Sequence, residues 1–164
     1  VTQRADTALL NALVPQADVV IDCCDNFATR QAVNLACVTH RKPLVSGAAI
    51  RMDGQVSVFD STQTDAPCYA CIFPPEQTPE ETRCATMGVF APVVGVIGCM
   101  QAAQALMLAS RARAVLDGRL SPSVDDVLAL AEPVLRHRMA LNFAARAEGA
   151  KLADVIAALK ADLG

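Results

Sequence analysis

An acidic turn follows a short run of β-branched residues near the start of the chain. Val19, Val20 and Ile21 are typical of a parallel strand that is covered on both faces. Asp25 and Asn26 follow at the carboxyl end of that strand, where open α/β sheets place their ligand-binding crevice. A carboxylate in this place can hold a magnesium ion beside a nucleotide phosphate. The alternative interpretation is that Asp25 or Asn26 only caps the next helix.

Two cysteines form a second group of candidate ligands. Cys68 and Cys71 follow Pro67, and their two-residue spacer lets both sulfur atoms reach one ion. A closed zinc site needs four ligands, and the sequence contains no second Cys-x-x-Cys, so the pair is half of a site. The chain has seven cysteines, an odd number, and no secretory signal, which favours reduced thiols and metal ligation over a disulfide framework.

The elements that must position these groups alternate between strands and helices. The sequence predicts buried strands over residues 18–23 and 42–46, a half-exposed strand over 55–59, and helices over 26–41 and 90–116. Arg30, one helical turn after Asn26, could face the same crevice as Asp25, and the alternative is a solvated helix residue.

Composition narrows the class of protein. Hydrophobic residues make up 53% of the chain and charged residues 19%, so a core is available at this length. The net charge of −3 and the lack of a basic run argue against nucleic acid as a partner. The longest apolar stretch, residues 89–108, contains Pro92, glycines and glutamines, which favours a buried helix over a membrane span. The sequence shows no amino-terminal signal, and we expect a cytoplasmic protein.

Three motifs in order resemble one family of enzymes. They are Asp-Cys-x-Asp-Asn-x-x-x-Arg at 22–30, Ser-Gly-Ala-Ala-Ile-Arg-Met-x-Gly-Gln at 46–55, and Cys-x-x-Cys at 68–71. Over about residues 10–108 the chain resembles the ThiF/MoeB/HesA family, and its MoeB-like members most of all. These are relatives of ubiquitin-activating enzymes that adenylate the C-terminal Gly-Gly of ubiquitin-like sulfur-carrier proteins for molybdenum cofactor or thiamine biosynthesis. The expected fold is therefore α/β, a partial Rossmann-like sheet of the ThiF/MoeB type.

The resemblance assigns roles to particular residues. Asp25 would anchor the magnesium ion that neutralises the phosphates of ATP, with Asn26 and Arg30 as further cofactor-binding residues. Cys68 and Cys71 would supply half of a structural zinc site. Cys84 would lie in the loop that crosses the tail of the carrier, where a cysteine of some relatives forms a covalent link to it. The charge of Arg83 beside Cys84 would favour the nucleophilic thiolate, and a bystander loop cysteine is the alternative.

The sequence lacks the phosphate-binding loop that the family's fold contains. No Gly-x-Gly-x-x-Gly occurs in the 164 residues, so the chain matches the back half of the family's fold and, taken alone, is expected to be inactive. The predicted function is ATP-dependent adenylation of a sulfur carrier, present as an incomplete half. A non-catalytic carrier-binding or lid module is the alternative. The family's homodimer is possible here, and the residues do not identify which carrier is served.

The carboxyl-terminal third changes character and is predicted to be a small all-helical tail. Gly118 is a candidate helix C-cap, and residues 121–123 (Ser-Pro-Ser) open a second helix. Residues 109–164 resemble the C-terminal lid of MoxR-type AAA+ ATPases, through Pro-Val-Leu-Arg-His-Arg at 133–138 and Leu-Asn-Phe-x-Ala-x-Ala-Glu-Gly at 141–149. The predicted domains are thus 1–108 and 109–164. A fragment, a natural fusion and an assembly artefact would all give a sequence with these two resemblances.

Overall fold

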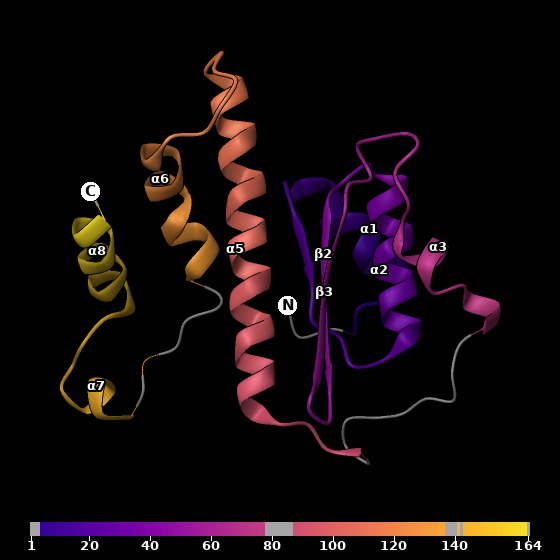
Figure 1. Ribbon diagram of the computed structural model, residues 1–164, viewed down its shortest axis with the longest axis horizontal. Coiled ribbons are helices and arrows are strands. Elements are labelled where there is room, and N and C mark those ends of the chain that lie inside the picture. Colours follow the sequence, from indigo (N-terminus) through magenta and orange to yellow (C-terminus); the bar gives the residue numbers. More distant parts are fainter. Residues whose placement is uncertain (1–3, 78–86, 137–140, 142, 164) are drawn as a thin grey trace. The chain divides into compact units, whose positions relative to one another are not determined.

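The chain has a mixed α/β structure with one small sheet (Figure 1). The computed structural model describes residues 4–77, 87–136, 141 and 143–163. Its helices are α1 (Thr7–Leu13), α2 (Phe27–Thr39), α3 (Tyr69–Ile72), α5 (Ala91–Leu116), α6 (Val124–Leu135), α7 (Phe143–Ala147) and α8 (Leu152–Leu163), with 3-10 turns η1 (Val14–Gln16) and η2 (Pro75–Gln77). Its strands are β1 (Val20–Asp22), β2 (Leu44–Ile50) and β3 (Asp53–Phe59). The predicted α/β class is confirmed, and the small sheet is consistent with part of a Rossmann-like fold.

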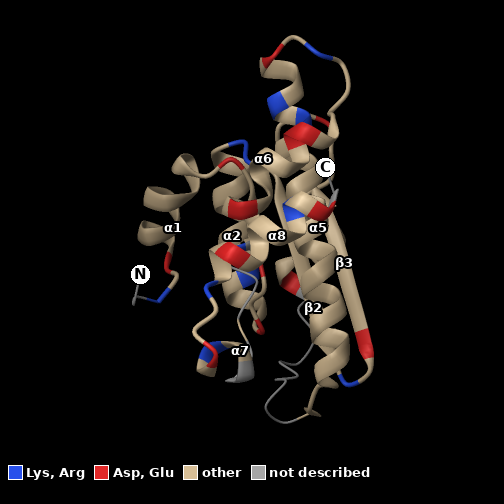
Figure 2. Ribbon diagram, turned by 90° about the vertical axis from the view of Figure 1, so that its left-hand side faces the viewer, with Lys and Arg blue, Asp and Glu red and all other residues tan. Residues whose placement is uncertain are grey.

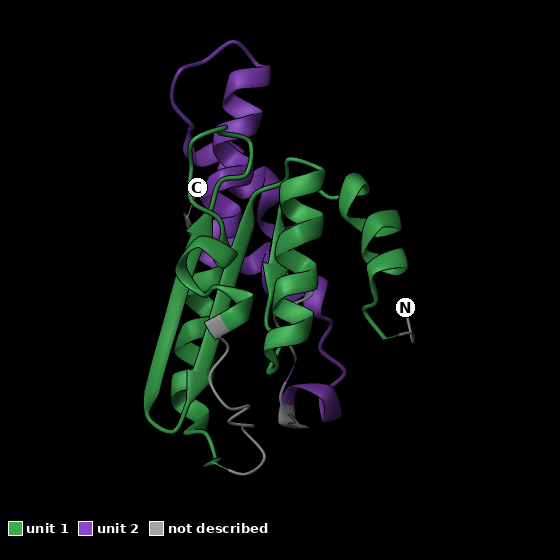
Figure 3. Ribbon diagram, turned by 90° about the vertical axis from the view of Figure 1, so that its right-hand side faces the viewer, with its two compact units in different colours: residues 1–101 green, residues 102–164 purple. Residues whose placement is uncertain are grey.

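The chain divides into two compact units, residues 1–101 and 102–164 (Figure 3). The first unit holds the sheet, and the second is helical. The predicted domain boundary at residue 108 concerns ancestry rather than compactness, and it stays a prediction.

The sheet has the order β1-β2-β3 and combines one parallel and one antiparallel pair. β1 runs parallel to β2, with α2 as the connection, and β2 turns back into β3 through a hairpin. The strand predicted over residues 42–46 is longer than expected because its second half pairs with β3 up to Ile50. At the hairpin tip Arg51 adopts a φ of 52°, in the left-handed region that non-glycine residues seldom occupy.

The helix after β1 begins and ends close to its predicted limits. The side chain of Asn26 caps α2, because its Oδ1 accepts the Thr29 N–H at 2.8 Å. Asn26 therefore does cap the helix, and its part in cofactor binding stays a prediction.

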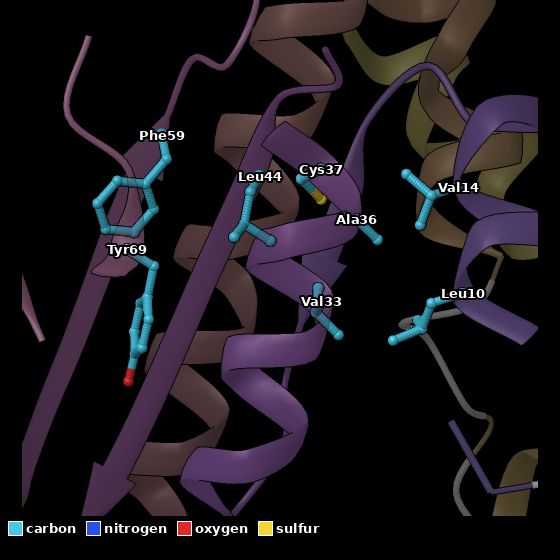
Figure 4. Packing of buried hydrophobic residues seen from close by; sticks show 8 residues of the cluster. All are labelled: Leu10, Val14, Val33, Ala36, Cys37, Leu44, Phe59 and Tyr69. Atoms are coloured by element: carbon cyan, nitrogen blue, oxygen red, sulfur yellow. The ribbon is translucent and has the colours of Figure 1, made fainter. Parts of the chain in front are cut away.

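The core of the first unit lies between α1, α2 and the sheet (Figure 4). Leu10 on α1 packs towards Val33 on α2, and Tyr69 sits edge-on to Phe59 with ring centroids 5.9 Å apart. The buried cluster consists of Leu10, Val14, Val33, Ala36, Cys37, Leu44, Phe59 and Tyr69. α1 has no counterpart among the predicted elements; the whole helix is seven residues long, too short for a clear helical pattern.

The long predicted helix is confirmed as α5, and it is unbroken. Pro92 lies in its first turn, where a missing N–H costs no hydrogen bond, and residues 91–110 carry no charge (Figure 2). By length and composition α5 could cross a membrane, and 22% of its most apolar window is buried. Core helices of soluble proteins pass the same test, so the expected absence of a membrane association stays a prediction.

In the second unit, predicted end signals of two helices are confirmed. Gly118, with a φ of 73°, follows α5, and the Arg119 N–H donates to Ala114 O at 2.8 Å in a Schellman pattern. Ser123 caps α6, and Asp126 completes a capping box by accepting the Ser123 N–H at 2.7 Å. Arg119 donates two hydrogen bonds of 2.7 Å to the same carboxylate.

Candidate functional site

The acidic turn lies at the carboxyl end of β1, as predicted from the sequence. Asp25 is exposed, and its Oδ1 accepts a 3.4 Å hydrogen bond from the side chain of Asn26. Asp22, at the end of β1, is buried, and its Oδ1 accepts the Cys24 N–H at 2.9 Å. The turn therefore presents one carboxylate to solvent and turns the other inwards.

Arg30 connects this turn to the sheet by hydrogen bonds. Its guanidinium pairs with Asp22 Oδ2 at 3.1 Å and donates to Ser46 Oγ at 3.1 Å and to Gly47 O at 2.8 Å. It also donates to the carbonyl oxygen of Cys24. Arg30 is 7% exposed, so it is not the solvated helix residue of the alternative interpretation. Its predicted contact with a nucleotide stays a prediction, because its described partners are all protein atoms.

The side chain of Gln101 also binds to the backbone of β1 and β2. Its Nε2 donates to Asp22 O at 2.7 Å and to Val45 O at 3.2 Å, and its side chain also meets Cys23 Sγ at 3.4 Å. Gly47 makes room for it, since a Cβ there would lie 2.3 Å from Gln101 Cδ. Sequence reasoning missed this contact. The signal that could have shown it is a glutamine in an uncharged apolar helix, together with a glycine in a buried strand.

Cys24, next to Asp25, is a poor nucleophile. Burial raises the pKa of Cys24 to about 12, and a hydrogen bond with Asp22 adds to the shift. The thiol therefore stays protonated at neutral pH. Cys84, the candidate nucleophile, lies outside the described residues, so its role stays a prediction.

Cys68 and Cys71 converge as the half-site interpretation requires. Their sulfur atoms are 3.6 Å apart. Two thiolates at 2.3 Å from one tetrahedral zinc ion would be about 3.8 Å apart. The pair thus fits one edge of such a site. Among the residues that the structure describes, no group of three or more His, Cys, Asp or Glu side chains could hold a metal.

Hydrogen bonds favour the charged form of one of these thiols. Burial alone would raise the pKa of Cys68. Hydrogen bonds from the side chain of Asn34 and from the backbone of Cys71 and Ala70 outweigh it and hold that pKa below its ordinary value. Metal ions bind the thiolate, so this environment suits the binding of a soft divalent cation.

Comparison with known proteins places these features in a family. The model of the ThiF family matches residues 1–131, which include the acidic turn, Arg30, the thiol pair and Gln101. The chain belongs to the ThiF family. The match runs past residue 108 into the part that resembles a MoxR lid, and nothing shows that second resemblance, which stays a prediction.

The similar ThiF-family proteins are larger. An adenylyltransferase and sulfurtransferase MOCS3-1 of Drosophila pseudoobscura pseudoobscura is 46% identical over 123 residues, covering 71% of this chain and 27% of the relative. The MOCS3 protein of Dictyostelium discoideum is 42% identical over 121 residues, covering 73% of this chain and 28% of the relative. The chain therefore spans about a quarter of the length of the curated relatives it matches.

Proposed function

We propose that this chain is the magnesium-holding and carrier-facing part of an enzyme that adenylates a ubiquitin-like sulfur-carrier protein. The observation that carries the proposal is the acidic turn: Asp25 is exposed just after β1, whose last residue, Asp22, is bound by both Arg30 and Gln101. The names of its MOCS3 relatives, adenylyltransferase and sulfurtransferase, support this class of reaction.

The proposed reaction brings two anions together. The carboxylate of the carrier's terminal glycine attacks the α-phosphorus of ATP, and pyrophosphate leaves. A bound magnesium ion neutralises phosphate charge in such a step, and it usually takes one or two carboxylates with phosphate oxygens and water. Asp25 offers one exposed carboxylate, which fits that ligand set. The hydrogen bonds of Arg30 and Gln101 to Asp22 would keep the Asp25 carboxylate at a fixed point, as preorganised catalysis requires.

The phosphates of ATP also need backbone donors, which a glycine-rich loop usually supplies at a helix N-terminus. This sequence has no such loop. We infer that adenylation needs a nucleotide-binding half that supplies this loop, and that these 164 residues by themselves do not adenylate.

The thiol pair has a structural part in this proposal. Cys68 and Cys71 would supply two thiolate ligands to a zinc ion, and two further ligands would come from outside the described residues. Such an ion would hold the segment after β3 without taking part in the chemistry.

The test is ATP–pyrophosphate exchange with a Gly-Gly-ended carrier and magnesium, in the presence of the nucleotide-binding half of a MOCS3 relative. We expect Asp25→Asn to lower exchange at least 100-fold, because the metal loses its protein ligand. The matched control is Asp18→Asn, which removes the same charge from an exposed residue just before the same strand and should stay within twofold of wild type.

Equal exchange by Asp25→Asn and wild type would refute the role of Asp25 as the magnesium ligand. Carrier binding that survives Asp25→Asn and ignores ATP, together with no exchange under any condition, would instead favour a carrier-binding module. Calorimetric titration of the carrier into both variants separates these results.

A further inference from the structure

One buried amide of α2 faces the thiol pair. Asn34 is 4% exposed, and both ends of its side chain are occupied. Its Oδ1 accepts the Tyr69 N–H at 2.9 Å, and its Nδ2 donates to Cys68 Sγ at 3.6 Å. A single side chain therefore holds both the backbone between the cysteines and one of the sulfur atoms.

The segment that carries the cysteines is fixed by packing as well. Tyr69 lies in the core, with its ring edge-on to Phe59 and 4.8 Å from the ring centroid of Phe73. The Cys71 N–H donates to Cys68 O at 3.1 Å, which closes the turn between the two thiols. The sulfur atoms are thus held near the spacing of two tetrahedral ligands before any ion arrives.

We propose that Asn34 is a positioning residue for a soft divalent metal ion at Cys68 and Cys71. Asn34 does not touch the ion. Its N–H orients the Cys68 sulfur and compensates the charge of the thiolate, as groups behind metal ligands commonly do. This inference concerns the thiol pair alone, so it stands or falls independently of adenylation.

α2 offers a matched control one turn earlier. Gln31 donates from Nε2 to Phe73 O at 2.7 Å, so it also ties α2 to the segment just after the cysteines. The hydrogen bond described for the Gln31 side chain goes to this carbonyl oxygen and not to either sulfur atom. If Asn34 acts only by anchoring this segment, losing Gln31 should weaken metal binding by a similar factor.

The experiment is a titration of the metal-free, reduced 164-residue chain with Cd²⁺, followed by thiolate-to-metal charge-transfer absorbance. Cys68→Ser combined with Cys71→Ser identifies the signal that belongs to this pair, because other cysteines are present. We expect Asn34→Ala to raise the dissociation constant at least tenfold, the scale found for residues behind metal ligands. We expect Gln31→Ala to stay within threefold of wild type.

Circular dichroism of each metal-free variant shows whether the fold is kept. If Asn34→Ala does not fold, Asn34→Leu fills the same buried volume without the N–H donor and carries the same expectation. The proposal is overturned if the Asn34 variant binds within threefold of wild type, or if Gln31→Ala loses as much affinity. It is also overturned if wild type shows no signal that depends on Cys68 and Cys71.

Discussion

Replacing Arg30 by methionine should lower the free energy of unfolding of the first unit substantially. The substitution keeps much of the side-chain length and removes a buried guanidinium that donates to atoms of Asp22, Cys24, Ser46 and Gly47. Removing one partner of a buried ion pair typically costs about 3–5 kcal/mol, because the other charge stays buried. Asp22 would keep hydrogen bonds from Ser46 Oγ at 3.2 Å and from the Cys24 N–H. We therefore expect a loss near the lower end, about 3 kcal/mol.

Urea unfolding at neutral pH, followed by circular dichroism, measures this loss. Arg136→Met is the control, since it breaks an exposed ion pair with Glu132 and should cost less than about 1 kcal/mol. Arg30→Met combined with Asp22→Leu removes both buried charges and should recover most of the stability. A loss below about 1 kcal/mol for Arg30→Met, or a double variant no more stable than the single one, would refute the buried-charge argument.

Two further predictions concern Gln101 and the second unit. Gly47→Ala should lower the free energy of unfolding by about 2–4 kcal/mol, because the new Cβ displaces the Gln101 side chain. The loss should be clearly smaller in a Gln101→Ala background. Equal losses in both backgrounds, measured by urea unfolding, would contradict the contact. The hydrogen bonds from Arg119, followed by those from Ser123, hold the pKa of Asp126 well below its ordinary value. Its stabilisation is therefore present above the ordinary carboxyl pKa of about 4 and is lost as pH falls towards the folded-state value. Melting temperatures from pH 7 to 2 should fall more steeply for wild type than for Asp126→Asn, and parallel curves would exclude this linkage.

Local patterns predicted most elements of the first unit. The β-branched run at Val20 and Ile21 specified β1, and the polar–apolar alternation specified β3, because these signals arise within a few neighbouring residues. The second half of β2 was missed for a related reason. Residues 46–50 include serine, glycine and two alanines, which carry little strand signal and are held by pairing with β3.

The surroundings of the candidate site were less predictable. Asp25 was placed correctly at a strand end, because that position follows from the order of strand and helix. The partners of Arg30 come from the end of β1, the turn after it and the middle of β2, and Gln101 lies 79 residues from Asp22 along the chain. Spacing along the sequence carries no information on such contacts. An arginine one turn into a helix fits a solvated face, a phosphate contact and a buried ion pair equally well until the sheet is assembled.

α2 shows how one helix can serve two sites of different chemistry. Asn26, Arg30 and Asn34 are spaced by four residues, so they lie along one face of the helix. The first caps the helix beside Asp25, the second pairs with Asp22 under the acidic turn, and the third holds the Cys68 sulfur. A rotation of α2 about its axis would disturb the contacts of Arg30 with Asp22 and of Asn34 with Cys68 together. The acidic turn and the thiol pair both contact α2, so the position of this one helix affects both of them.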